Sequence, residues 1–420
     1  MKFIKNYLNW NTYFTVALLF ESLLVLKIYP MSGKLHIILF VLYFFITGLK
    51  QNIDKSLEFL KKYCWIFVFL ILWIVHFGVK SDNTKLVVIF FLYFYSGYLS
   101  SYQNKRYMDS GKVFVLCFFP ILIVSLILHF LQINPLLSRF PAAMVFKEYS
   151  TDRLVSIFAH AIPAGCIFTV YALLSLFSVK NKILKYGCFL LGLLCVFLSG
   201  SRGCMLGCLI TLMILLWMYK DILKILCKEF SSKKSVALIL VFFIVLFILL
   251  YNVPSINHQI SGVWSRILGA KNEMGNSFYR FVAWKVMLTI AWPSSSLSTK
   301  LLGGGYQSCL PAMVAAGNEF INSVKEGNSA GLLLGTVDNA YFSLLYDGGL
   351  LAIIVILAIL GFTIYELIKG DKNGKHLAVV ILSLNICALT FDMQYWSSIT
   401  FVFLYMFGLL VGGYGHENEN

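Results

Sequence analysis

The sequence predicts an all-α protein, a polytopic membrane bundle of about 12 transmembrane helices with one long extramembrane segment. Hydrophobic residues make up 59% of the 420 residues and charged residues only 13%, and mean hydropathy is +0.81. A soluble domain carries about 25% charged residues and could not cover so apolar a chain with polar groups. The second observation is that most basic residues lie between the apolar runs. Together they exclude a soluble enzyme, a DNA-binding domain and a disordered chain.

Twelve apolar runs approach the length of about 20 residues that a helix needs to cross a bilayer. They lie near residues 12–29, 35–49, 63–79, 85–100, 113–133, 154–178, 183–200, 203–219, 236–252, 340–365, 376–392 and 396–413. None shows the alternation of a barrel strand. We therefore expect helices 1–9 in residues 1–252, a large outer segment over 253–337, and helices 10–12 with a short tail in 338–420.

The connecting loops alternate in charge, which predicts their sidedness. One set holds 20 basic residues: Lys2, Lys5, Lys50, Lys55, Lys61, Lys62, Lys105, Arg106, Lys112, Lys180, Lys182, Lys185, Lys220, Lys224, Lys228, Lys233, Lys234, Lys369, Lys372 and Lys375. The short loops of the other set hold Lys34, Lys80, Lys85 and Arg202. We therefore expect both termini in the cytoplasm, with segments 134–153 and 253–337 on the outer side. The net charge of +15 reflects this topology, and no nucleic-acid partner is expected.

The ten cysteines lie mostly in or against apolar runs, and no CxxC or HxxxH pair is present. The sequence therefore gives no support for a metal site. Cys204 and Cys208 share a helix face, where small packing residues are expected. Cys309 is alone in the long outer segment and cannot close a disulfide there.

Residues 198–203 (LSGSRG) place one arginine between two apolar runs, with only serine and glycine beside it. This predicts a tight outer hairpin that holds Arg202 at the bilayer edge. A guanidinium there costs a few kcal/mol unless it is paired or hydrated. Anion binding is the functional interpretation; snorkelling to the surface or capping a helix is the alternative.

The outer segment 253–337 holds six basic residues against three acidic ones. Residues 276–292 predict an amphipathic helix lying on the membrane, with Phe278, Phe281, Val282, Lys285, Leu288 and Thr289 on one face. The glycines at 303–305 predict a turn that lets the backbone approach another segment closely. Arginine forks match phosphate oxygens, so an anionic headgroup is a candidate ligand. Ordinary solvated loop charge is the alternative.

Two helix starts carry further polar residues. Thr336, Asp338 or Asn339 can cap the tenth run, and Asp338 could instead be a carboxylate that accepts a proton from a sugar hydroxyl. Asp347 either faces the interior or lies where the Gly348–Gly349 pair loosens the helix. Arg153 is expected at the outer start of the sixth run, where the helix dipole favours anions. His160, expected inside that run, is either a proton carrier or a hydrogen-bonded bundle histidine.

The arginine hairpin, the long outer segment with its arginine-bearing helix, and a [DH]-N-x-Y helix start followed by a glycine pair occur in this order over residues 150–412. This set resembles the bacterial O-antigen polymerase/O-antigen ligase superfamily. The resemblance implies a GT-C-like membrane glycosyltransferase of the inner membrane with a periplasmic active site. Its expected partners are undecaprenyl-pyrophosphate-linked oligosaccharides, which are its substrates, and membrane lipid. Such an enzyme uses no cofactor and needs no metal. A chain-length regulator protein is a family-level partner.

Carried over residue by residue, the resemblance implies that Arg202, Arg280 and Asp338 are catalytic. Arg153, Arg266, Tyr279, Asn339 and Tyr341 are then candidates for contacting substrate. Asp338 stands where ligases typically have a histidine, which favours a polymerase that moves the growing glycan onto the next lipid-linked unit. A ligase that transfers glycan to lipid A-core and a lipid-linked oligosaccharide flippase are the alternatives. A transporter would be expected to show repeat halves, and no internal repeat is evident.

Overall fold

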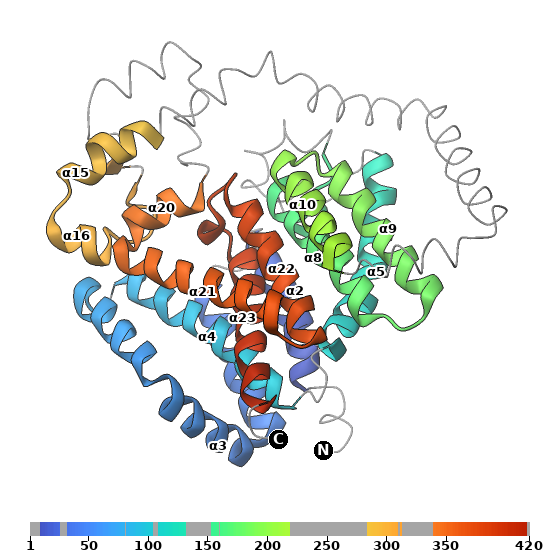
Figure 1. Cartoon of the computed structure of the whole chain (residues 1–420), viewed down its shortest axis with the longest axis horizontal. Helices are drawn as coiled ribbons and strands as arrows, with labels where there is room; N and C mark the ends of the chain where they lie inside the picture. Colours follow the sequence, from blue (N-terminus) through green and yellow to red (C-terminus); the bar gives the residue numbers. More distant parts are fainter. Residues whose placement is uncertain are drawn as a thin grey trace, which may run out of the picture.

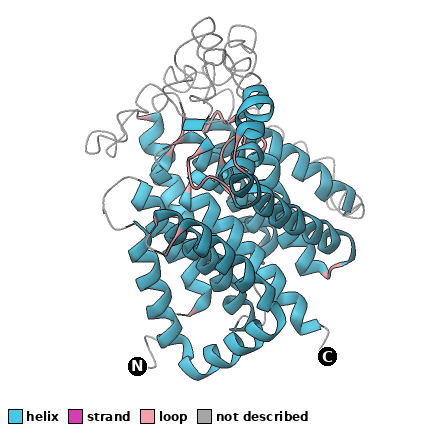
Figure 2. Cartoon of the chain, turned by 90° about the vertical axis from the view of Figure 1, so that its left-hand side faces the viewer, coloured by secondary structure: helices cyan, strands magenta, loops and turns pink. Residues whose placement is uncertain are grey.

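The computed structural model describes residues 9–25, 32–79, 81–103, 108–131, 153–158, 160–218, 284–309, 311–312 and 339–417. These residues form helices and connecting turns and contain no strand (Figure 2). The all-α prediction is therefore confirmed for the described part of the chain.

The helices follow one another along the chain as labelled in Figure 1. They are α2 (Trp10–Val25), α3 (Ser32–Phe77), α4 (Asp82–Gln103), α5 (Met108–Phe130), η1 (Ser156–Phe158), α8 (Ala161–Ser178), α9 (Lys182–Leu198), α10 (Arg202–Met218), η3 (Met287–Ala291), α15 (Trp292–Ser294), α16 (Leu297–Leu302), α20 (Ala340–Asp347), α21 (Gly349–Lys369), α22 (Lys372–Ala388), η4 (Met393–Tyr395) and α23 (Ser397–Glu417).

Four stretches within the described helices are long and apolar enough to cross a membrane: His36–Phe77, Asp109–Phe130, Ala161–Ser178 and Gly349–Lys369. Arg202–Met218 and Ser397–Gly413 are shorter apolar helices. The protein is thus a membrane-embedded helical bundle. The predicted run at 236–252 lies outside the described residues, and the total of about 12 spans stays a prediction.

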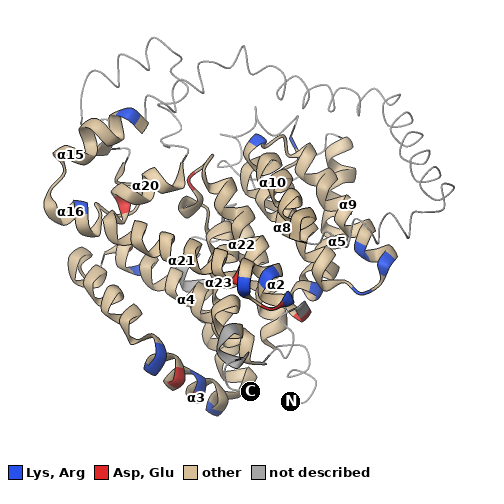
Figure 3. Ribbon diagram, viewed as in Figure 1, with Lys and Arg blue, Asp and Glu red and all other residues tan. Residues whose placement is uncertain are grey.

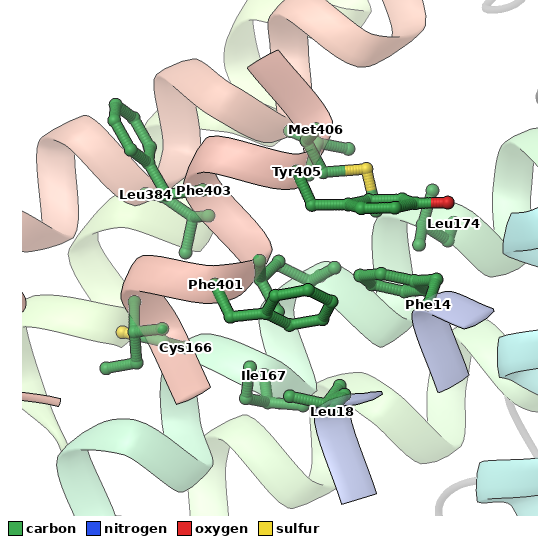
Figure 4. Close-up of a cluster of buried hydrophobic side chains, with 14 of the residues drawn as sticks. Phe14, Leu18, Cys166, Ile167, Leu174, Leu384, Phe401, Phe403, Tyr405 and Met406 are labelled. Atoms are coloured by element: carbon green, nitrogen blue, oxygen red, sulfur yellow. The ribbon is translucent and has the colours of Figure 1, made fainter. Parts of the chain in front are cut away.

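Helix α23 lies in the middle of the bundle and packs most extensively on α4. Close approach explains why glycines are needed there. A Cβ atom on Gly408 would lie 2.0 Å from the carbonyl oxygen of Phe94, and one on Gly97 equally close to that of Tyr405. On its other sides α23 contacts α2, α8 and α22. Figure 4 shows the resulting core, where Phe14 of α2, Ile167 of α8 and Leu384 of α22 surround Phe401 and Tyr405.

Two predicted helix boundaries are wrong. Residues 50–62, expected as a loop, are helical within α3, which is interrupted only by non-helical dihedrals at Gly48 and Tyr63. The lysines, glutamate and leucines of this stretch are strong helix formers, which explains the difference. The sixth run does not begin at 154, because α8 starts at Ala161 after a short 3₁₀ turn.

Lysines gather at one end of the bundle, where α2 begins and α23 ends (Figures 1 and 3). The opposite end, which we call the hairpin end, consists of residues 78–79, 81, 153–158, 160, 199–201, 303–309 and 389–396. Contacts join these segments: His76 Nε2 lies 2.9 Å from the Gly303 carbonyl oxygen, and the His160 and Trp396 rings stack with centroids 5.1 Å apart. These contacts bring together loops that the charge pattern expects on one side, and their sidedness stays a prediction.

Candidate functional site

The arginine hairpin forms as the sequence predicts. Helix α9 ends at Leu198, and the next helix begins at Arg202, so only three residues make the reversal. Gly200 takes a φ of +61°, a left-handed conformation that glycine adopts without strain. The Ser199 amide closes the last turn of α9 by donating to the Cys195 carbonyl at 2.9 Å. Arg202 is exposed at the start of α10.

Arg153 lies directly against this hairpin. Its Nε donates to the Ser199 carbonyl at 2.8 Å, and the Leu154 amide donates to the Leu198 carbonyl at 2.9 Å. The Arg153 side chain packs over Gly200, where a Cβ atom would lie 3.4 Å from Nε. The expectation that Arg153 begins a helix is wrong. Arg153 and Arg202 nevertheless lie on adjoining segments, Arg153 in the hairpin end and Arg202 at the start of α10 directly after it.

His160 is the N-cap of α8 and does not lie inside the span, which corrects its predicted position. The Ile162 amide donates to its Nδ1 at 3.2 Å. Burial, reinforced by the nearby charge of Arg153, lowers the pKa of His160 to about 3. The imidazole is therefore neutral at physiological pH, which fits the hydrogen-bonded alternative and not a proton carrier.

Asn339 caps the helix that carries the family-like Asn-x-Tyr pattern. Its Oδ1 accepts from the Tyr341 and Phe342 amides at 3.0 and 3.2 Å, and its Nδ2 donates to the Leu389 carbonyl at 3.2 Å. The Asn339 amide donates to Asp392 Oδ1 at 3.1 Å. The Tyr341 hydroxyl lies 3.2 Å from both the carbonyl oxygen and Oδ1 of Asn385. These contacts support the cap interpretation of Asn339.

Asp347, at the end of α20, holds the loop that follows α16. Its two carboxylate oxygens accept from the Gln307 amide at 3.1 Å, the Ser308 hydroxyl at 3.1 Å, the Cys309 amide at 3.0 Å and the Tyr395 hydroxyl at 2.7 Å. Burial raises the pKa of Asp347 to about 6, although these hydrogen bonds act in the opposite direction. Asp347 therefore organises the loop and has little acceptor capacity left for a substrate.

The predicted glycine turn approaches the break between α20 and α21. Gly303 has a φ of +91°, and its Cβ atom would lie 2.0 Å from the Asp347 carbonyl oxygen. Across the contact, Gly349 has a φ of +71°, and its Cβ atom would lie 2.5 Å from the Leu301 carbonyl oxygen. The chain therefore stops being one helix at the glycine pair, as the sequence suggested, and Asp347 faces the interior.

A cavity of about 620 Å³ runs between α3, α4, α21 and α23. Most of its wall is aromatic or aliphatic, including Trp73, Phe90 and Phe362. Trp65 and Ile354 line it and are also exposed, so the cavity reaches the apolar outer surface between α3 and α21. We call this space the α3–α21 groove.

The hairpin end of the groove is polar. Asn83, Tyr306, Asp347 and Gln394 line it there. Gln394 is only 6% exposed, and neither atom of its amide has a hydrogen-bond partner among the described residues. Such a group costs free energy unless a ligand or water satisfies it. The groove is thus a long apolar space that ends at groups able to bind hydroxyls or amides.

Four candidate residues, Arg266, Tyr279, Arg280 and Asp338, lie outside the described residues. The described end of the predicted amphipathic stretch buries Val286, Met287 and Ala291 against the side of α20. The face expected to be apolar, with Lys285, Leu288 and Thr289, is exposed. The contact of this exposed face with a membrane stays a prediction.

The sequence interpretation gave no role to Asp392, Gln394 or Tyr395, which the structure places beside Asn339, the groove and Asp347. A polar cluster (DMQY) between two apolar runs was the available signal. The sequence interpretation also missed that Cys166, Cys204 and Cys387 converge, because their helices are separated along the chain.

Residues 187–357 match the Wzy_C family model, described as O-antigen ligase. The matched segment contains the arginine hairpin, Asp347 and all of the predicted outer segment 253–337. A comparison with curated proteins found no match.

Proposed function

We take membership of the O-antigen polymerase/ligase superfamily, which the match over residues 187–357 supports, as the premise and propose that this protein polymerises surface polysaccharide. In this proposal it joins undecaprenyl-pyrophosphate-linked oligosaccharide units on the periplasmic side of the inner membrane. The growing glycan leaves its carrier and moves onto the next lipid-linked unit. The fold is then of the GT-C type.

The observation that carries the proposal is the α3–α21 groove. Its aromatic and aliphatic wall suits a long polyprenyl chain, and a cavity of about 620 Å³ is in the range of ligand sites. Its polar end offers the Gln394 amide and the Tyr306 hydroxyl to sugar hydroxyls. Because polymerisation needs two lipid-linked substrates, the bundle must hold a second lipid elsewhere.

The arginines are assigned to the donor diphosphate. Only the donor's diphosphate gains negative charge as the glycosidic bond breaks, so preorganised cations act there. Arg202 and Arg153 at the hairpin, with Arg280 from the outer segment, are proposed to stabilise that charge without a metal ion. Beside the Asp347 carboxylate a leaving diphosphate would be destabilised, so we assign the groove to the acceptor unit.

The acceptor hydroxyl needs a base and a fixed position. Asp338 remains the proposed base. Asp347 is not chosen, because four donors already occupy its carboxylate. Attack opposite the leaving diphosphate would invert the anomeric centre. The residues proposed to line the substrate path are Arg266, Tyr279, Asn339 and Tyr341. Asn339 contributes by capping α20, the helix that carries Tyr341.

The ligase remains a second candidate, because the matching family model is described as O-antigen ligase. A ligase would use one lipid-linked glycan and lipid A-core, and so would need only one polyprenyl site.

The test is reconstitution of the purified protein in vesicles that contain lipid-linked repeat units and no lipid A-core. A polymerase produces a ladder of longer lipid-linked glycans, and Arg202→Ala abolishes it while the protein still inserts. Product that forms only after lipid A-core is added would establish the ligase instead. In cells, deletion should leave one repeat unit per anchor.

The assignment of the groove has its own matched pair of variants. Ala358 and Leu357 are both exposed, but only Ala358 lines the groove. Ala358→Trp fills the groove and should raise the KM for lipid-linked units by about 10-fold or more, since a buried hydrocarbon contact of a few kcal/mol is lost. Leu357→Trp should leave the KM unchanged. Equal behaviour of both variants would remove the groove from the proposal.

A further inference from the structure

Three buried cysteines from three helices meet behind the arginine hairpin. They are Cys166 of α8, Cys204 of α10 and Cys387 of α22, and their sulfur atoms all lie within 4.8 Å of one another. The Cys166 and Cys204 sulfurs are 3.4 Å apart. All three side chains are 0% exposed. We propose that these thiols form a binding site for one soft monovalent metal ion, Cu⁺, between α8, α10 and α22.

The geometry suits three-coordinate sulfur ligation. Metal–sulfur bonds of about 2.3 Å place three sulfurs in a plane about 4 Å apart. One separation in the trio is 3.4 Å and the others are no more than 4.8 Å, so small rotations of the side chains would complete the site. Soft sulfur ligands suit Cu⁺, and also Zn²⁺ and iron–sulfur clusters.

Two glycines make room for the sulfur atoms. A Cβ atom on Gly207 would lie 2.6 Å from the Cys387 sulfur, and one on Gly165 would lie 3.0 Å from the Cys204 sulfur. The helices therefore approach one another at the trio, and larger side chains at these positions would force the thiols apart. Ordinary apolar packing does not require sulfur at all three positions.

The number of ligands favours a monovalent ion over Zn²⁺. Cu⁺ replaces one thiol proton, which leaves to solvent, so the buried site keeps its net charge and no redox step occurs. A structural divalent ion such as Zn²⁺ takes four ligands, whereas only three sulfur atoms converge here among the described residues. Cys204 is the natural thiolate, since it lies in the first turn of α10 and accepts a hydrogen bond from the Ser201 hydroxyl at 3.2 Å.

A bound ion would cross-link α8, α10 and α22 about 3 Å along the axis of α10 from Arg202. It would fix the hairpin relative to His160 and Thr390, which lie on the adjoining segments. This role is structural and independent of the proposed glycosyl transfer, so the site and the function can fail separately.

The test is an anaerobic titration of the full-length, reduced protein in detergent with Cu⁺ held by the chromophoric chelator bathocuproine disulfonate. We expect one Cu⁺ per chain to be withdrawn, and Cys166→Ser, Cys204→Ser and Cys387→Ser each to weaken the binding by about 100-fold. Cys195→Ser is the matched control, because Cys195 is equally buried but outside the trio, and it should bind as the wild type does.

X-ray absorption at the copper edge tests the wild-type protein without any substitution. Three sulfur neighbours and no nitrogen would agree with the proposal. Withdrawal of no Cu⁺, equal binding by all four variants, or nitrogen in the coordination shell would overturn it.

Discussion

Removing the Asp347 carboxylate should release the loop that it holds and expose Cys309. In Asp347→Ala, four donors lose their acceptor: the Gln307 and Cys309 amides and the Ser308 and Tyr395 hydroxyls. The Cys309 amide is buried and the other three donors are partly buried, so at about 1.5 kcal/mol for each the loss is at most about 6 kcal/mol.

Relief from burying a charge offsets part of this loss. The rise in the Asp347 pKa from 3.8 to about 6 corresponds to about 3 kcal/mol of cost for the ionised form. The net destabilisation of the closed loop is then at most about 3 kcal/mol, or about 100-fold in its opening equilibrium. Asp347→Asn should have a much smaller effect, because one oxygen still accepts and the Tyr395 hydroxyl can rotate to accept from the new amide.

Cys309 labelling measures this opening, since its side chain is 1% exposed in the closed loop. We expect a thiol reagent to modify Cys309 up to about 100-fold faster in Asp347→Ala than in wild type. Peptide mass spectrometry measures the rate of this labelling. Labelling of Cys195 should not change, which separates loop opening from global unfolding. Asp82→Ala, at an exposed carboxylate, is the control substitution. Unchanged Cys309 labelling in Asp347→Ala would refute the assignment of Asp347 as the residue that holds the loop.

The same carboxyl gives a pH dependence with a defined sign. Its folded-state pKa lies above the unfolded value of 3.8, so its contribution to loop closure is present below pH 3.8 and is lost as pH rises through about 6. Cys309 labelling in wild type, divided by the reactivity of an unfolded thiol, should therefore increase between about pH 4 and 6. The two Asp347 variants should lack this step, and a step of the opposite sign would contradict the assignment.

Three further predictions concern the fold and the reaction. His160→Ala should destabilise the protein by about 1 kcal/mol through loss of the bond from the Ile162 amide, and His160→Asn should restore most of it, as thermal unfolding would show; equal melting of both variants would exclude the cap role. Gly408→Ala should disrupt α23 against Phe94 and lower the melting temperature, whereas Gly361→Ala, where nothing lies within 4 Å of the new methyl group, should be neutral or stabilising by up to about 1 kcal/mol; a tolerated Gly408→Ala would contradict the close approach of α4 and α23. Polymer ladders made by the reconstituted protein should be unaffected by EDTA, and their loss would refute arginine-only stabilisation of the diphosphate.

Local features of the sequence were sufficient wherever one short motif determined the backbone. The hairpin at 198–203 follows from glycine and serine between two apolar runs, and the break at Gly348–Gly349 follows from the glycine pair. Each of these depends on residues close together in the chain.

Features that depend on distant segments were not predictable. Helix α8 was expected too early because residues 154–158 are apolar like the span; Pro163 in its first turn was the available sign of the later start. The hydrogen bonds of Asp347 and Asp392 join segments from three parts of the chain. The polar end of the groove and the cysteine trio likewise exist only after the helices pack.

The opening of the α3–α21 groove onto the apolar flank of the bundle has a kinetic consequence. A lipid that enters there remains in the bilayer and diffuses in two dimensions to reach the protein. Its effective concentration is then its mole fraction among the membrane lipids, so diluting the vesicles with water should leave turnover unchanged. Diluting the substrate with inert phospholipid, at constant bulk concentration, should slow it.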